Sequence, residues 1–199
     1  MQLIMRKLIC LVLTITIGIA AFAQQEHLTF KNIPISGPSS SFIEKMKQAG
    51  FEVVSELENG LVMEGTFVGL SDCKILVGIT PKTKTVWKVI AQLPSKSSWY
   101  SVKNQYFEFK EKYTDKYGKP NDEFEFFSKP YYEGDGYELQ AVKNDKGYYT
   151  TYWKSDLGII VVSIAATSSS EGWVQLGYED ANGVEIRRQE ESTIIDDDI

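Results

Sequence analysis

The chain has 199 residues and a formal net charge of −6, with 27 acidic side chains against 21 basic ones. Proteins that bind nucleic acid neutralise phosphates with clustered Lys and Arg, and no such cluster occurs, so the composition argues against nucleic acid and anionic membrane surfaces as partners. The length suits one ordinary domain, or two very small ones that share a core.

The first 23 residues have the pattern of a signal peptide. Arg6 and Lys7 precede an uncharged run over residues 8–20, and the segment closes on Ala21-Phe22-Ala23, a small-x-small cleavage pattern. The run is shorter than the roughly 20 apolar residues of a spanning helix, so we expect cleavage and no membrane span afterwards. The mature chain would begin at Gln24, carry a net charge of about −8 because two basic residues leave, and be periplasmic or extracellular.

Residues 24–96 are expected to form a first helix-plus-sheet unit. The stretch 27–35 alternates loosely and predicts a short strand that runs into a turn. Ser41, with Glu44 three residues later, resembles a capping box and predicts a helix over 42–50. Strand-like runs at 60–70, 73–80 and 85–93 then predict an antiparallel meander.

Residues 97–199 are expected to form a second unit that ends in an acidic tail. Ser97 or Ser98 caps an amphipathic stripe that starts at Trp99 and stops at Gly118-Lys119-Pro120, which predicts a helix. Strands are expected at 124–127, 137–143, 147–154, 157–167 and 172–179, with tight hairpins at 144–147 and 155–156. Residues 180–185 fit a hairpin turn or helix cap better than a calcium loop.

The order of helix and meander occurs twice, and the two halves can be aligned. At an offset of 85, Ile75 falls on Ile160 and Val77 on Val162, which indicates a duplication, with chance agreement between apolar strands as the alternative. This order resembles the tandem architecture of the beta-lactamase inhibitor protein (BLIP) and of related small outer-membrane lipoproteins. Stretch 27–35 also resembles the start of small exported bacterial proteins of unknown function. The resemblance implies an α+β fold of two tandem helix-plus-antiparallel-meander repeats, and it carries over no catalytic residue.

Few residues offer catalytic chemistry. His27 is the single histidine and lies beside the expected mature terminus, while Cys73 is the single cysteine after cleavage, so no metal site, cofactor or Cys-His pair is expected. Carboxylates such as Glu133 and Asp135 lie in or beside predicted loops. Since a glycosidase needs only two carboxylates at a set separation, a carbohydrate-active enzyme is one alternative.

Aromatic residues suggest a binding function. On strand 147–154, Tyr148 and Tyr152 should face one side of the sheet and Tyr149 and Trp153 the other, and residues 159–164 are apolar at both parities. Packing between the two halves, or dimerisation, would cover the second face of the sheet. If neither covers it, this face would bind another envelope or secreted protein, or a glycan. We expect a non-enzymatic binding or inhibitory module, with a structural envelope protein as a further alternative. The candidate binding residues are expected on the sheet face away from the helices or on the adjoining loop, and they are Trp153, Tyr149, Trp173, Tyr131 and Tyr132.

Overall fold

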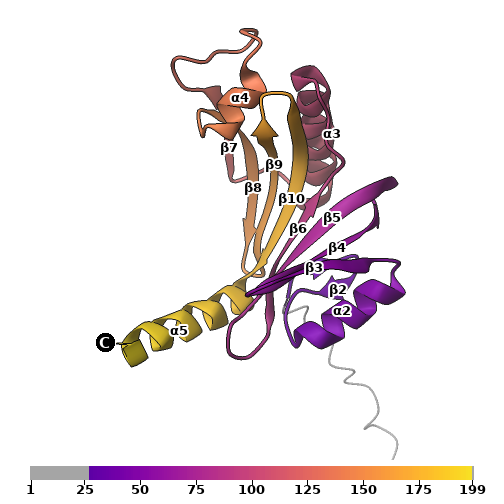
Figure 1. Cartoon of the computed structure of the whole chain (residues 1–199), viewed down its shortest axis with the longest axis vertical. Helices are drawn as coiled ribbons and strands as arrows, with labels where there is room; N and C mark the ends of the chain where they lie inside the picture. The colour runs from indigo at the N-terminus through magenta and orange to yellow at the C-terminus, as the bar shows by residue number, and fades with distance from the viewer. Residues whose placement is uncertain (1–26, 199) are drawn as a thin grey trace, which may run out of the picture.

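Four strands from residues 52–92 and four from residues 122–180 form one antiparallel sheet (Figure 1). The computed structural model describes residues 27–198, so the predicted signal peptide lies outside the described residues. In spatial order the strands are β3 (Glu52–Leu57), β4 (Gly60–Phe67), β5 (Leu70–Ile79), β6 (Val86–Gln92), β10 (Glu171–Asp180), β9 (Gly158–Ser168), β8 (Gly147–Ser155) and β7 (Asp122–Phe127). Two further strands, β1 (Thr29–Phe30) and β2 (Ile33–Pro34), form a separate hairpin.

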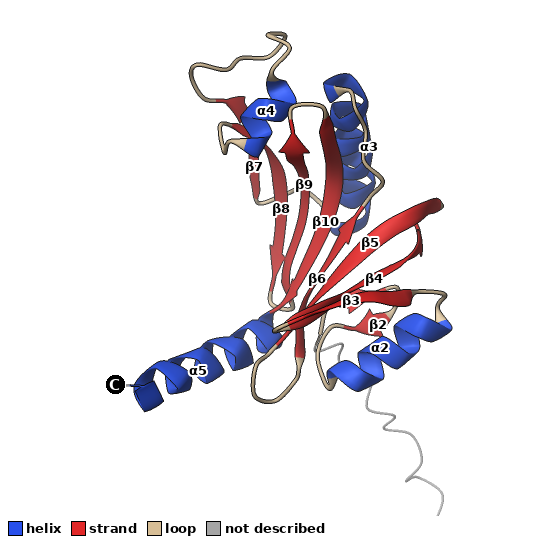
Figure 2. Ribbon diagram, in the orientation of Figure 1, coloured by secondary structure: helices blue, strands red, loops and turns tan. Residues whose placement is uncertain are grey.

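Four helices occur among the described residues, which confirms the α+β class. They are α2 (Ser39–Gln48), α3 (Trp99–Tyr117), α4 (Glu138–Lys143) and α5 (Ala181–Asp198). Figure 2 shows α2 and α3 beside different halves of the sheet, with α5 extending away from it. The expected acidic tail therefore lies in a helix up to Asp198.

The predicted helices and strands agree with the structure at most places. Beyond a cap at 180–185, helix α5 was not expected, and stretch 27–35 forms the β1–β2 hairpin instead of one strand. Three further departures occur. Residues 138–143 form α4 and no strand; Glu, Leu, Gln, Ala and Lys are good helix formers, so local propensity prevails there and 144–147 is no hairpin turn. Strand β3 was not expected. Helix α2 begins at Ser39, after Pro38, so Ser41 lies inside the first turn and makes no capping bond.

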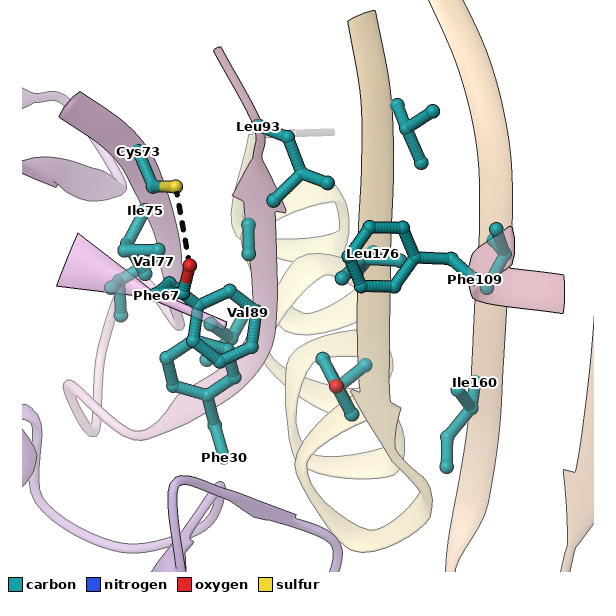
Figure 3. Close-up of a cluster of buried hydrophobic side chains, with 14 of the residues drawn as sticks. Phe30, Phe67, Cys73, Ile75, Val77, Val89, Leu93, Phe109, Ile160 and Leu176 are labelled. Carbon is teal, nitrogen blue, oxygen red and sulfur yellow. Dashed lines mark hydrogen bonds between the residues drawn. The ribbon is translucent and has the colours of Figure 1, made fainter. Parts of the chain in front are cut away.

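The sheet has a covered face, here called the helix face, and an open face. On the helix face, paired residues from four strands form one row, and its members Ile75, Ala91, Leu176 and Val162 are all fully buried. Figure 3 shows part of this core, with Phe109 of α3 lying next to Leu176. The same apolar cluster includes Phe42 and Met46 of α2, so both helices cover the helix face.

Buried acidic side chains fix the start and the middle of α5. Asp180 is fully buried, and its carboxylate accepts the N–H of Gly183 at 2.9 Å and that of Leu28 at 3.0 Å, which confirms a helix cap here. Further along, the buried Glu190 carboxylate accepts the N–H groups of Lys82 at 2.6 Å and Thr83 at 3.0 Å. The turn between β5 and β6 therefore holds the middle of α5.

Candidate functional site

Tyr149 and Trp153 lie on the helix face, so their expected placement away from the helices is wrong. Tyr149 is 4% exposed and packs edge-on against Trp99, with 4.9 Å between ring centroids. Trp153 is 5% exposed and donates its Nε1 hydrogen to the Gly118 carbonyl at 2.9 Å. The aromatic stripe of α3 provides the ring partners that draw this side of β8 inward.

The other three expected residues are dispersed. Strand alternation places Trp173 on the open face, paired with Ala165, where it is half-buried. The Tyr131 hydroxyl accepts a hydrogen bond from Asn144 Nδ2 at 3.1 Å, which ties it to the end of α4. Tyr132 is 66% exposed on the loop after β7. The structure therefore does not bring the five candidate residues into one site.

A line of mostly apolar residues, here called the apolar row, crosses the open face from β4 to β8. Each member is paired with the next one on the adjacent strand, across six neighbouring strands, and all members except the glycine are half-buried. From β4 to β8 they are Val62, Leu76, Ile90, Gly177, Val161 and Tyr152. Because an antiparallel sheet with one solvated face normally exposes polar residues there, this row departs from the expected alternation.

Polar residues flank the apolar row on both sides. One flanking row contains Lys88 and Glu179, whose Nζ and Oε1 atoms are 2.5 Å apart, and the other pairs Gln92 with Gln175. At the β7 edge, Lys154 Nζ lies 2.6 Å from a carboxylate oxygen of Asp122. Charges of both signs are paired, so the open face has an apolar centre, a polar margin and no strong net charge.

The centre of the open face is hollowed into a groove of about 450 Å³. Its floor comes from β6, β10, β9 and β8, and Val142 and Lys143 at the end of α4 contribute to its wall. Gly177 lies in this floor. A Cβ atom at Gly177 would meet only Val161, at an ordinary contact distance of 3.6 Å, so the glycine leaves space that a side chain could occupy.

An aromatic cluster adjoins the groove at the β7–β8 edge. Phe126 and Tyr148 have ring centroids 5.1 Å apart, and Phe124 and Tyr152 have centroids 6.2 Å apart. Phe124 is 45% exposed and Phe126 is 46% exposed. Sequence reasoning missed both phenylalanines as site residues, although the alternation of Glu and Phe in 123–126 was a usable signal.

The loop carboxylates have structural partners. Glu133 forms an ion pair with Lys103 and accepts a hydrogen bond from the Tyr149 hydroxyl at 3.2 Å; the bond from Lys103 is the main reason why the pKa of Glu133 is lowered. Asp135 accepts the N–H groups of Tyr132 and Tyr137 at 3.0 and 2.7 Å. These bonds hold the loop between β7 and α4 against α3.

The described residues offer little other chemistry. Burial raises the pKa of the Cys73 thiol, which points to backbone carbonyls such as that of Phe67 (Figure 3). Within residues 27–198, no group of three or more His, Cys, Asp and Glu side chains is placed to hold a metal ion. No helix in the same described part is long and apolar enough to cross a membrane.

No family model matches the chain, and comparisons with curated proteins and with solved structures give no match. The geometry of the open face and of the helix face therefore carries the functional argument.

Proposed function

We propose that the protein is an exported, non-enzymatic binding or inhibitory module that recognises another protein through the open face of its sheet. The observation that carries this proposal is the apolar row with its polar margins. Protein interfaces have the same anatomy, with an apolar centre that is desolvated on binding and a polar rim that stays wet. The exposed rings of Phe124 and Phe126 extend the apolar surface, and aromatic residues are enriched at such interfaces.

The chemistry of this surface favours a protein partner over a glycan. Aliphatic side chains such as Leu76 and Ile90, and phenylalanine rings, offer no hydrogen bonds to sugar hydroxyls. An apolar side chain of a partner loop would instead enter the groove above Gly177 and contact Val161. Because Lys88 and Glu179 already pair with each other, we expect binding to depend only weakly on salt.

A duplicated unit of the BLIP kind is part of the proposal. The order of strands supports it, because α2 precedes β3–β6, α3 precedes β7–β10, and the last strand of each set meets at the centre of the sheet. Ile75 and Ile160, which the alignment pairs, both lie on the helix face, on β5 and β9. The inhibitory role is the function that this resemblance implies, and the alternative enzyme has less support because Glu133 and Asp135 are engaged within their loop.

Filling the groove tests the proposal. Gly177→Val adds a side chain that suits a strand, and its Cβ atom would meet no backbone atom within 4 Å, so the variant should fold while it blocks the groove. Tyr100→Ser is the matched control, because Tyr100 is exposed on α3, away from the open face. Wild-type protein and both variants are crosslinked to an envelope fraction of the native host, and crosslinked residues are mapped by mass spectrometry.

We expect a wild-type partner crosslinked at the open face, lost in Gly177→Val and retained in Tyr100→Ser. Equal capture by wild type and folded Gly177→Val would refute the groove as the binding site. Two further measurements separate the alternatives. Light scattering that shows a dimer abolished by Gly177→Val would identify a second copy as the occupant, and selective retention on a glycan array would identify a sugar.

A further inference from the structure

A second cleft, of about 310 Å³, lies on the helix face between α3 and two hairpin turns, and we call it the helix-face cleft. One wall is the second half of α3. The opposite wall comes from the β1–β2 hairpin and the turn between β4 and β5. Its lining residues are Thr29, Lys31, Asn32, Phe67, Val68, Phe109, Lys112, Tyr113, Lys116, Tyr117 and Tyr178.

The floor of the helix-face cleft is made of rings. Phe67, Phe109, Tyr113 and Tyr178 come from β4, α3 and β10, and each is less than 10% exposed. Figure 3 shows Phe30 next to Phe67; their ring centroids are 4.7 Å apart and their planes are tilted by 35°. Because the floor rings are buried and pack against neighbouring rings, they offer a preformed apolar surface, as small-molecule sites commonly do.

The rim of the cleft is basic. Lys31, Lys112 and Lys116 line it, and no carboxylate is among the residues described as lining it. Lys31 and Lys116 lie over the rings of Phe51 and Tyr117, while Lys112 pairs with Glu108 one turn back on α3. In a chain with more acidic than basic side chains, this local charge favours an anion.

A pair of phenols adds a proton donor. The Tyr113 and Tyr178 hydroxyls hydrogen-bond to each other, and burial raises the pKa of both, so both stay protonated at neutral pH. The mutual bond uses one of the two phenolic protons. Among the described residues no other hydrogen bond involves either hydroxyl, so the second proton is available to an acceptor in the cleft.

Two tight hairpin turns form the wall of the cleft opposite α3. Val68 has a φ of 48° and is 50% exposed at the rim. A β-branched residue rarely adopts this left-handed conformation, which glycine or asparagine adopts at lower cost. Lys31 and Asn32, on the facing hairpin turn, also have positive φ values of 49° and 62°. Positive φ values at both central residues are what two-residue hairpin turns require, so these values come from the tight turns that form this wall of the cleft.

We propose that the helix-face cleft binds a small organic carboxylate, with its apolar body on the ring floor and its anionic group held by the lysines and the phenol pair. The size of the cleft suits a molecule with one aromatic ring or a short acyl chain. This site is separate from the groove on the open face, and it does not depend on the proposed protein partner.

Ligand-observed NMR with 4-phenylbutyrate tests the proposal on the purified protein, with the neutral 4-phenylbutanamide and inorganic phosphate as comparison probes. Lys31→Gln/Lys116→Gln removes two charges from the rim. The control Lys47→Gln/Lys146→Gln removes two exposed charges elsewhere. Circular dichroism checks that both variants fold.

We expect saturable binding of 4-phenylbutyrate, weaker by about tenfold for the amide and for phosphate. The rim variant should lose at least about fivefold in affinity, since each exposed charge contributes roughly that factor at close range. The control variant and Gly177→Val should bind as wild type does, which separates this site from the open face. Equal binding of acid and amide, an unchanged affinity in the rim variant, or no saturable binding would overturn the proposal.

Discussion

Replacing neighbouring aromatic residues of β8 by alanine should give opposite results, because the strand alternates between two faces. Trp153 lies under α3, packs against Tyr113 with 5.8 Å between centroids, and donates a hydrogen bond to Gly118. Tyr152 is half-buried in the apolar row, and its ring meets Phe124 at the open edge. Trp153→Ala should therefore destabilise the protein strongly and Tyr152→Ala only weakly.

The magnitude follows from buried area. A buried tryptophan side chain covers about 200 Å², which at about 25 cal/mol per Å² corresponds to roughly 5 kcal/mol as an upper limit. Alanine retains part of that area, and water can reach the exposed Gly118 to replace the lost hydrogen bond, so we expect about 4 kcal/mol for Trp153→Ala. For Tyr152→Ala we expect about 1 kcal/mol, because only part of its area and one cross-strand contact are lost.

Urea unfolding followed by far-UV circular dichroism measures both values without depending on the tryptophan signal. With a slope of about 2 kcal/mol per molar urea, Trp153→Ala should lower the midpoint by about 2 M and Tyr152→Ala by about 0.5 M. The melting temperature should fall by about 8 to 16 °C and by a few degrees, respectively. A loss for Tyr152→Ala as large as that for Trp153→Ala would refute the assignment of the two faces.

Two further predictions concern the ends of the chain. Burial acts to raise the pKa of Glu190, but hydrogen bonds from Thr83 and the Lys82 amide outweigh it and lower that pKa. The contribution of Glu190 to folding stability is therefore fully present above a pH of about 4.5, and it is lost as the pH falls through the lowered pKa. Hydrogen exchange of the wild type should show faster opening of α5 at acid pH. At pH 7, α5 should open faster in Glu190→Gln but not in the exposed control Glu191→Gln. Equal exchange rates in the two variants would contradict the contact between Glu190 and the β5–β6 turn. Expression of the whole chain in a bacterium should yield a mature protein that starts at Gln24, and Ala23→Arg should prevent cleavage, as N-terminal sequencing and mass measure; an uncleaved wild type would contradict the export signal.

Local sequence signals were sufficient where an element contains its own pattern. Helix α3 combines an apolar stripe with a stop at Gly118, whose φ is 82°, and its bounds agree with the prediction. Strand β3 has no such pattern, because it is an edge strand with almost every residue exposed. Its structure comes from backbone pairing with β4, which no periodicity in residues 52–57 reports.

The candidate site could not be placed from sequence because β8 carries aromatic residues on both faces. Alternation separates Tyr149 and Trp153 from Tyr148 and Tyr152, but which pair faces inward depends on a helix thirty residues away or more. The aromatic stripe of α3 determines it: Tyr106 and Tyr113 contact the inward pair. The sequence thus predicted an aromatic surface on the sheet but assigned the wrong pair of β8 residues to the face away from the helices.

The distribution of apolar residues on the open face argues for a local recognition surface over general burial. If a second sheet covered this face, the flanking rows would be apolar as well, as both inner faces of a sandwich are. Instead Lys88 pairs with Glu179 and Gln92 pairs with Gln175 on either side of the apolar row, and the Trp173–Ala165 pair lies beyond the second of these polar pairs. Gly177 interrupts that row at its centre, where a larger side chain would project into the groove. A narrow apolar line with a gap suits one inserted side chain or loop of a partner, and the Gly177→Val variant addresses that gap directly.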